Sequence, residues 1–373
     1  MRQCYPPMTP PLGIGIIGCG KISDAYFAGL RHYDFITIVA CADASQERAV
    51  AKAAQHGVRA LTVDELLAAP DIEIVVNLTI PQAHAAVNEA ILRAGKHAYC
   101  EKPFALNTAD GARVLARAKE KGLLVGCAPD TFLGSGLQTA RALIDSGAIG
   151  TPLSAMAHFL HRGHETWHPA PEFYYQAGGG PLFDMAPYYF TALINFLGPI
   201  ARVGGVSRRG YDERTITSQP LAGKKFPVEV QTHYFGTLEF AAGAVASFVM
   251  SFDTHQIPLP RIVVFGTEGT MEVPDPNHFH GDVKLFDRAT KTYYVAPPTH
   301  TAERLRGTGV ADMARAVRNR TRGFRASGDL AQHVLDAMCC VDLAASLGRT
   351  VPLETTCARP VAVPASLGSG QLD

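Results

Sequence analysis

The stretch LGIGIIGCGKIS, residues 12–23, decides the fold. An apolar run typical of a buried strand ends in a turn with Gly18 and Gly20, and a helical pattern opens at Ser23. This order fits the dinucleotide fingerprint G-x-G-x-x-G/A, with serine as the small third residue. Glycines make the tight turn and let backbone N–H groups reach a pyrophosphate, while the helix N-terminus adds partial positive charge. The residues expected to bind the cofactor here are Gly18, Gly20, Lys21 and Ile22.

An acidic residue follows the second predicted strand. Asp43 closes the run FITIVACAD at the distance from the glycines where a carboxylate holds the ribose hydroxyls of NAD. The same carboxylate would repel the 2′-phosphate of NADP, so NAD is favoured, although Arg48 nearby leaves NADP open. The alternative interpretation is a plain glycine turn and a helix-capping aspartate. The agreement of strand, turn, helix and acid favours a cofactor site.

The remaining pattern predicts the fold class. Short apolar runs alternate with helical patterns over the first third of the chain, which predicts β-α-β units and a parallel sheet covered on both faces. After about residue 134, alternating runs such as VQTHYFGTLEF are separated by turn residues, which predicts antiparallel hairpins. We therefore expect α/β plus α+β: an N-terminal Rossmann doubly wound parallel sheet, then an α+β domain with an open, mostly antiparallel sheet.

The chain length of 373 residues favours two domains. The N-terminal prolines and the small polar residues at the other end predict segments without regular structure. The expected organisation is a disordered lead at 1–11, an NAD-binding Rossmann domain at 12–133, a substrate-binding α+β domain at 134–355 and a flexible tail at 356–373.

Composition excludes several classes of function. The chain carries 34 basic and 34 acidic residues, so no charged surface for nucleic acid or membrane is expected. No apolar run reaches the roughly 18 uncharged residues of a membrane helix. The eight cysteines form no Cys-x-x-Cys pair, which argues against a disulfide framework and favours a reducing, cytoplasmic location.

Several further motifs carry a family resemblance. They are NLTIPQAH (77–84), CEKPFALN (100–107), GGGPLFDMAPYY (178–189), GVADMARAV (309–317) and SGDLAQHVLDAM (327–338). Together, and in this order, they resemble the Gfo/Idh/MocA oxidoreductases, which include glucose–fructose oxidoreductase and inositol dehydrogenase. The resemblance covers roughly residues 12–350. It implies that the nicotinamide lies between a Rossmann domain and a second domain whose sheet presents one face to the substrate.

The Glu-Lys-Pro motif, residues 101–103, locates the centre of the implied site. By resemblance Lys102 lies beside the reacting hydroxyl or carbonyl, and the Lys–Pro bond is often cis in this motif. Thr79, His84 and Glu101 would lie with it at the cofactor. His84 can equally be a helix residue that faces the sheet. The family's open sheet commonly pairs with another subunit, so a homodimer or homotetramer is expected.

The motif at 184–188 departs from the commoner family pattern. Many members have Asp-x-x-x-His with a histidine acid/base, whereas this chain has Asp184 and Tyr188, as in a minority that includes glucose–fructose oxidoreductase and dihydrodiol dehydrogenase. We expect Tyr188 to act as general acid/base with its pKa lowered by Lys102 and the nicotinamide ring. Asp184 would hold a substrate hydroxyl or orient its neighbours. Periodicity alone favours Asp184 as a helix N-cap. Whether Lys102 or Tyr188 moves the proton stays open.

The histidine segment, HFLHRGHETWHP at 158–169, contains four histidines and the only tryptophan. Its spacings follow no zinc pattern, so no metal is expected. The resemblance implies that this segment lines a carbohydrate pocket. The predicted substrate-binding residues are Arg162, His164, Trp167, His168 and Asp184, with Arg162 and His164 suited to an anionic group. The alternative is a strand whose polar side faces solvent.

Three functions fit these residues. The first is an NAD-dependent oxidoreductase that transfers hydride between nicotinamide and a hydroxyl or carbonyl carbon of a sugar or sugar derivative. The second is a redox-neutral, NAD-dependent glycoside hydrolase outside the usual two-carboxylate scheme, with an anionic glycoside as one candidate substrate. The third is a non-catalytic NAD-binding sensor. The intact Glu-Lys-Pro and Asp-x-x-x-Tyr motifs argue against the sensor.

Overall fold

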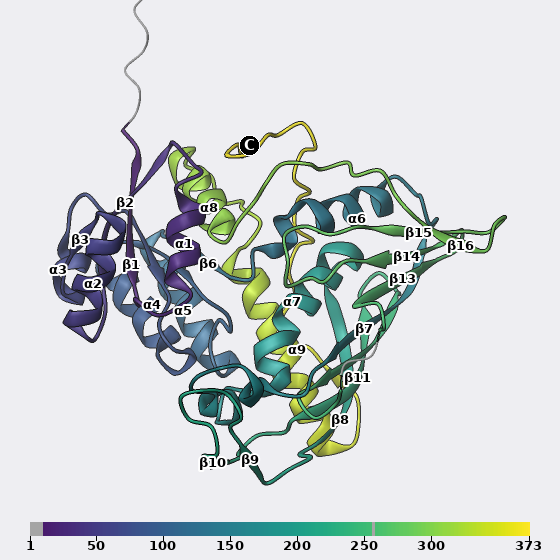
Figure 1. The fold of residues 1–373 in the computed structure, drawn as a ribbon. Coiled ribbons are helices and arrows are strands. Elements are labelled where there is room, and N and C mark those ends of the chain that lie inside the picture. Colours follow the sequence, from purple (N-terminus) through teal and green to yellow (C-terminus); the bar gives the residue numbers. More distant parts are fainter. Residues whose placement is uncertain (1–9, 256–257) are drawn as a thin grey trace, which may run out of the picture.

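The expected fold class is confirmed. The computed structural model describes residues 10–255 and 258–373, so most of the predicted disordered lead lies outside the described residues. A parallel six-stranded sheet forms the N-terminal part, and a mixed, mostly antiparallel nine-stranded sheet forms the second part (Figure 1).

The N-terminal sheet has the Rossmann strand order β3-β2-β1-β4-β5-β6, and every described pair in it is parallel. Its strands are β1 (Leu12–Ile17), β2 (Ile36–Ala42), β3 (Arg59–Ala60), β4 (Ile74–Asn77), β5 (His97–Cys100) and β6 (Val125–Cys127). Its helices are α1 (Ser23–Leu30), α2 (Gln46–His56), α3 (Val63–Ala68), α4 (His84–Arg93) and α5 (Thr108–Lys121), with the 3-10 turn η1 (Pro81–Ala83). The order reverses between β1 and β4, which opens a crevice at their carboxyl ends.

The second sheet has the order β16-β15-β14-β13-β7-β12-β11-β8-β17. Its strands are β7 (Pro152–Leu160), β8 (Ile200–Arg208), β11 (His233–Phe240), β12 (Val245–Ser251), β13 (Ile262–Gly266), β14 (Thr270–Val273), β15 (Lys284–Asp287), β16 (Thr292–Val295) and β17 (Val351–Pro352). Strands β7 and β12 are parallel, and the other neighbours are antiparallel. A separate hairpin pairs β9 (Glu213–Thr215) with β10 (Lys225–Pro227).

Two long helices fill the space between the sheets. Helix α7 (Gly180–Leu197) packs on β12, and α9 (Gly328–Leu347) packs on β8 and also reaches α5 and β6 (Figure 1). Helix α9 is long and apolar enough to cross a membrane by length and composition alone. Most of its apolar residues are nevertheless buried in the core, and Asp336 within it accepts hydrogen bonds from the backbone of residues 354 and 355. Those contacts are typical of a core helix.

The start of α7 corrects one interpretation of the sequence. Asp184 was a candidate N-cap, but α7 begins at Gly180 and its N-cap is Gly179. Gly180 has φ +80°, and a Cβ there would lie 2.9 Å from the carbonyl oxygen of Gln231. This close approach fixes the start of the helix, so Asp184 lies inside it, where its carboxylate is free for other partners.

The C-terminal segment also differs from expectation. Residues 356–373, predicted to be a flexible tail, lie against the protein, with Val363 and Leu372 buried. The carbonyl oxygen of Val363 lies 2.7 Å from His300 Nε2, and Asp373 pairs with Arg325 at 2.5 Å. Before this segment, helices α8 (Thr308–Arg318) and α9 return the chain to the first sheet. Helix α8 contacts α1 and β6 there.

The seven cysteines within the described part of the chain are free thiols, and Cys4 lies outside it. Cys19, Cys41 and Cys100 are fully or almost fully buried at the ends of strands, as their apolar settings predict. The cytoplasmic location stays a prediction.

Candidate active site

The glycine-rich turn after β1 has the shape that a dinucleotide needs. Gly18 has φ +105°, and a Cβ there would lie 2.5 Å from the carbonyl oxygen of Leu78, so only glycine allows this approach. A Cβ at Gly20 would meet no described atom within 4 Å, which leaves the turn open on that side. Helix α1 begins at Ser23, directly after the turn. The backbone therefore offers N–H groups and a helix N-terminus to a pyrophosphate.

Asp43 lies at the end of β2 beside this turn. Its Oδ2 accepts a hydrogen bond from the backbone N–H of Cys19 at 2.9 Å, and its Oδ1 accepts one from Ser45 at 2.8 Å. Arg48 approaches Oδ1 at 3.1 Å with a largely exposed side chain. Asp43 thus braces the turn, and each carboxylate oxygen retains a lone pair for a ribose hydroxyl.

The edge of the crevice is built by β4 and β5. Thr79 donates from its hydroxyl to Asn77 Oδ1 at 2.6 Å. Glu101 accepts from the Tyr26 hydroxyl at 2.8 Å and from the backbone N–H of Lys102 at 2.9 Å. The ring of His84 is buried, with Nδ1 2.7 Å from the Pro103 carbonyl oxygen and Nε2 3.0 Å from that of Thr79. His84 therefore joins two loops of the crevice, and a direct cofactor contact by this residue stays a prediction.

Lys102, Asp184 and His164 form one hydrogen-bonded cluster. The Lys102–Pro103 bond is cis. Lys102 Nζ donates to Asp184 Oδ1 at 2.6 Å and to its carbonyl oxygen at 2.9 Å. His164 Nε2 lies 2.9 Å from Asp184 Oδ2. The sequence placed these residues in three separate motifs, and the structure brings them together.

Burial and charge fix the protonation states of the pair. Burial alone would lower the pKa of Lys102, but the carboxylate of Asp184, helped by Tyr188 and Glu101, raises this pKa above its usual value. Burial alone would raise the pKa of Asp184, but Lys102 and His164 hold it well below the usual carboxyl range. The pair is therefore an ammonium and a carboxylate at neutral pH.

The pKa of Tyr188 is set by opposing effects, and the expected lowering by Lys102 is one of them. Lys102 does lie over its ring, 5.3 Å from the centroid, but burial raises the pKa of Tyr188, and Lys102 and Arg306 offset only part of this effect. Arg306 donates to the Tyr188 hydroxyl at 3.3 Å and to Asn277 Oδ1 at 3.0 Å. The phenol is therefore protonated at neutral pH, and its O–H remains available to donate.

The histidine segment is partly strand and partly loop. Its first residues belong to β7, which ends at Leu160. The loop that follows contains the 3-10 turn η3 (His164–Thr166) and, after the segment, the 3-10 turn η4 (Glu172–Tyr175). Trp167 donates from Nε1 to His164 Nδ1 at 3.2 Å, while Lys21 lies 5.7 Å from the Trp167 ring centroid. His168 packs beside Trp167. Arg162 instead lies over Tyr211, so the structure does not join it to the cluster.

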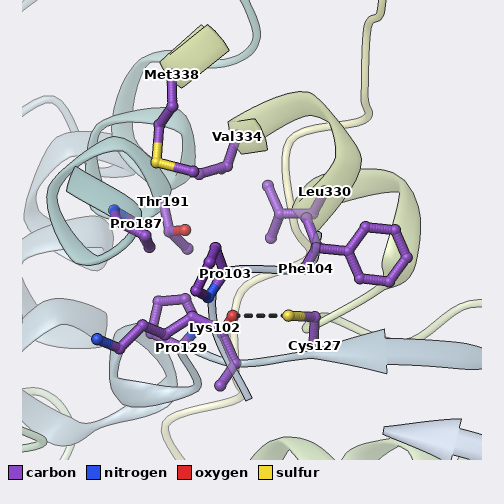
Figure 2. A pocket seen from close by; sticks show the side chains of 12 residues that line it. Lys102, Pro103, Phe104, Cys127, Pro129, Pro187, Thr191, Leu330, Val334 and Met338 are labelled. Atoms are coloured by element: carbon purple, nitrogen blue, oxygen red, sulfur yellow. Dashed lines mark hydrogen bonds between the residues drawn. The ribbon is translucent and has the colours of Figure 1, made fainter. Parts of the chain in front are cut away.

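A small apolar cavity lies behind Lys102 (Figure 2). Its volume is about 20 Å³, room for about one water molecule. Figure 2 shows the Lys102 ammonium pointing away from Phe104 and Leu330 on the cavity wall. This cavity is too small and too apolar for a sugar, so the reacting face of Lys102 is the side that carries Asp184.

Some members of the site have no signal in the sequence. Arg306 lies 118 residues from Tyr188 and in no recognisable motif. Tyr174 packs on the His164 ring at 4.0 Å between centroids, and only its place just before the glycine run could have suggested it. Across the described residues, no group of three or more histidine, cysteine or acidic side chains could hold a metal ion.

The glycine-rich turn and a lysine at the end of β5 define an NAD(P)-binding oxidoreductase fold. Comparison with known families agrees: the "oxidoreductase family, NAD-binding Rossmann fold" matches residues 12–128, and the "GFO/IDH/MocA C-terminal domain" matches residues 137–272. These matches cover more than half of the chain, which therefore belongs to the Gfo/Idh/MocA family.

Individual relatives give the same assignment. The chain is 30% identical to dTDP-3,4-didehydro-2,6-dideoxy-alpha-D-glucose 3-reductase of Streptomyces violaceoruber, over 86% of this chain and 91% of that protein. It is 26% identical to 1,5-anhydro-D-fructose reductase of Ensifer adhaerens, over 77% and 88%. Its fold is similar to that of levoglucosan dehydrogenase in complex with NADH and L-sorbose, with a TM-score of 0.79 and 22% identity over 93% and 100% of the two chains.

The Lys102–Asp184 pair gives a prediction for stability. Asp184→Asn leaves a buried ammonium without its counter-charge and should lower the free energy of unfolding by about 3–5 kcal/mol at pH 7. The pKa of Asp184 is lower in the folded than in the unfolded chain, so its stabilisation is complete above the ordinary carboxyl pKa of about 3.9 and is lost as pH falls below it. Because the folded-state pKa lies well below that value, urea unfolding from pH 7 to pH 3 should show a wild-type advantage that is constant down to about pH 4 and begins to shrink below it.

The matched control is Asp71→Asn, which removes a half-exposed ion pair with Arg59 and should change stability little. Equal losses in the two variants, or a wild-type advantage that does not shrink at all between about pH 4 and pH 3, would contradict the role assigned to the buried pair.

Proposed function

We propose that this protein is an NAD-dependent dehydrogenase or reductase of a sugar or sugar derivative. The observation that carries the proposal is the Lys102 ammonium, held by Asp184 at the crevice where β5 meets the second domain. The relatives reported above, a dTDP-sugar reductase and an anhydrofructose reductase, support a carbohydrate substrate. They also favour net oxidation or reduction over redox-neutral glycoside hydrolysis and over a sensor.

The chain's own residues would bind and polarise the reacting oxygen. Lys102 has a third N–H beyond the two that Asp184 uses, and Tyr188 has an O–H beyond the bond that it accepts from Arg306. Both can donate to one substrate oxygen, where negative charge develops as hydroxyl becomes carbonyl or the reverse. The nicotinamide, when bound, supplies or takes the hydride. Trp167 and His168 would then cover the apolar face of the sugar ring.

The first test follows NADH absorbance with a panel of free sugars, sugar nucleotides and nitrophenyl glycosides. We expect NADH to change in step with sugar consumed, and Lys102→Ala to lower kcat/KM by about a thousandfold or more because the charged donor is lost. Tyr188→Phe should lower kcat by about 10²- to 10³-fold, the loss of one oxyanion donor. Cofactor binding, followed by the emission of the single tryptophan, should persist in both variants.

The control is Tyr189→Phe, which removes a neighbouring buried hydroxyl without a hydrogen-bond partner among the described residues, and which should keep near-normal turnover. Near-normal rates in Lys102→Ala and Tyr188→Phe would refute the site. Release of nitrophenol without net NADH would replace the dehydrogenase by a glycosidase.

We also propose that the cofactor is NAD rather than NADP. The Asp43 carboxylate, beside the glycine-rich turn, would meet the ribose and repel a 2′-phosphate, although exposed Arg48 lies beside it. We expect NADP to bind at least about tenfold more weakly than NAD, a difference of about 1.4 kcal/mol. Asp43→Ser should lower the ratio of the NADP Kd to the NAD Kd, and Arg48→Ala should raise this ratio. Titrations monitored by tryptophan emission measure both constants; NADP binding as tightly as NAD would refute the role of Asp43.

A homodimer or homotetramer through the nine-stranded sheet is the assembly we propose. The face away from α7 and α9 exposes Met156, Val206 and Phe235, and Phe235 lies opposite Val206 in register. Light scattering should give a dimer or tetramer mass, and Phe235→Lys should shift it towards the monomer. Val50→Lys, an exposed apolar position on α2, should leave the mass unchanged. A monomeric wild-type protein would contradict the assembly.

A further inference from the structure

The two ring nitrogens of His164 have different partners. Nε2 lies 2.9 Å from Asp184 Oδ2, and Nδ1 lies 3.2 Å from Nε1 of Trp167. An indole N–H can only donate, so Nδ1 must be the unprotonated nitrogen. The proton of the neutral ring is therefore on Nε2, where it is donated to the carboxylate.

This arrangement is that of an oriented base. A carboxylate that holds one ring N–H fixes the tautomer, turns the other nitrogen outward and stabilises the imidazolium that forms when this nitrogen takes a proton. Here Asp184 is the carboxylate that holds the Nε2–H group, and Nδ1 is the nitrogen on the other side of the ring. Trp167, which covers it, is about half exposed and lies next to Lys21 of the glycine-rich turn. The Nδ1 lone pair thus lies on the side of the ring that faces Trp167, and in this structure the indole N–H occupies it.

The other groups of the cluster are fixed near neutral pH. Lys102 is held as an ammonium and Asp184 as a carboxylate. Tyr188 is held as a phenol. Imidazole is the side chain whose ordinary titration lies closest to neutrality. Of these four side chains, His164 is the one suited to exchange a proton during turnover.

We propose that His164 is the general acid/base of the reaction, with Nδ1 as the proton-transferring atom and Asp184 as its orienting partner. The proposal rests on the proposed dehydrogenase function and assigns to a residue of the histidine segment the proton transfer that the sequence placed on Tyr188 or Lys102. Trp167 occupies the position at Nδ1 that a substrate hydroxyl, or one bridging water, takes.

The proton balance is complete. In the oxidation direction the hydroxyl O–H bond breaks and its proton goes to His164 Nδ1, directly or through the water. The bound nicotinamide would accept the carbon-bound hydrogen with its electron pair, which would leave the oxygen as a carbonyl. Lys102 and Tyr188 donate hydrogen bonds to that oxygen throughout. Reduction is the reverse, with the imidazolium returning the proton.

The loop that carries His164 is anchored from behind. Its backbone N–H donates to the Tyr175 hydroxyl at 3.1 Å, and Tyr175 donates to Glu165. Glu165 in turn pairs with buried Arg214 at 2.5 Å. Gly163 has φ +106°, and a Cβ there would lie 2.3 Å from Glu165 Oε2. These contacts hold the imidazole in place while the outer part of the loop, with Trp167, stays at the surface.

Several other groups face the imidazole and bear on its titration. They are Asp184 from α7, Tyr174 from η4, Phe252 after β12, His161 from the end of β7, and Trp167 and His168 from the same loop. Of these, only the carboxylate is in direct hydrogen-bond contact with Nε2.

The kinetic test is the pH profile of kcat/KM for oxidation from about pH 5 to 9. The base must be neutral, so the wild-type rate should fall as pH drops through one protonation. His164→Asn should lose this acid limb and about 10²- to 10⁴-fold of the rate, and added imidazole should restore part of the rate to His164→Ala. His161→Asn, which keeps a side-chain acceptor for the Gly163 N–H, should retain the limb. An acid limb that survives in His164→Asn would overturn the inference.

The second test needs neither cofactor nor sugar. Trp167 is the only tryptophan, and an imidazolium beside an indole quenches its emission. His168 also packs beside Trp167, so the comparison is made in proteins that all carry His168→Asn. In this background, emission should fall with acid through a single protonation when His164 is present, also with His161→Asn, and stay flat in His164→Asn; the same transition in His164→Asn would overturn the inference. If the wild-type protein oxidises or reduces no sugar, the proposed function fails and the inference with it. If the wild-type protein turns over a sugar and His164→Asn keeps the acid limb of the pH profile, the inference is overturned and the proposed function stands.

Discussion

The ion pair between Lys102 Nζ and Asp184 Oδ1 is the interaction on which the rest of the structure depends. It joins the end of β5 in the Rossmann domain to α7 in the second domain, 82 residues further along the chain, at 2.6 Å. Both side chains are nearly buried, with exposed fractions of 16% and 11%. Charges so poorly solvated stay ionised only together. The pair therefore fixes the place of α7 across the crevice and, with it, every group that α7 contributes.

Helix α7 can serve this pair because of how it begins. The glycines at 178–180 start the helix four residues before Asp184, so the carboxylate is a side chain on the helix face rather than a cap. Tyr188 follows one turn later on the same face, and both residues meet Lys102. Pro187 lacks the N–H that would bond the carbonyl of Phe183, and at the adjoining Asp184 the carbonyl accepts the second bond from Lys102. One helix thus supplies three of the contacts that hold the ammonium.

The sequence predicts those features that local spacing determines. The strand, the turn at Gly18 and the acid at Asp43 follow from the order of residues, and the alternation of patterns predicts both sheets. What depends on distant packing could not be read. Arg306 reaches Tyr188 from a loop without a motif. The polar C-terminal segment docks through two buried side chains, Val363 and Leu372, that no periodicity marks. The pKa of Tyr188 is shifted upward because the side chain is buried, whereas the sequence indicates only the charged neighbours that lower this pKa.

The partners of each group within the cluster also order its chemistry. The charges of Lys102 and Asp184 and the neutrality of Tyr188 are set where solvent is largely excluded, because there each group's state depends on its fixed partners. Such groups can bind and polarise an oxygen, but they exchange protons poorly. His164 differs from these groups in its partners rather than in its exposure, because its side chain is as buried as that of Asp184. Asp184 lies at one ring nitrogen and half-exposed Trp167 at the other, so one side of the imidazole is oriented and the other meets the one partner that reaches the surface. The proposed acid/base role of His164 would separate the fixed charges from the exchangeable proton, with Tyr188 as a hydrogen-bond donor.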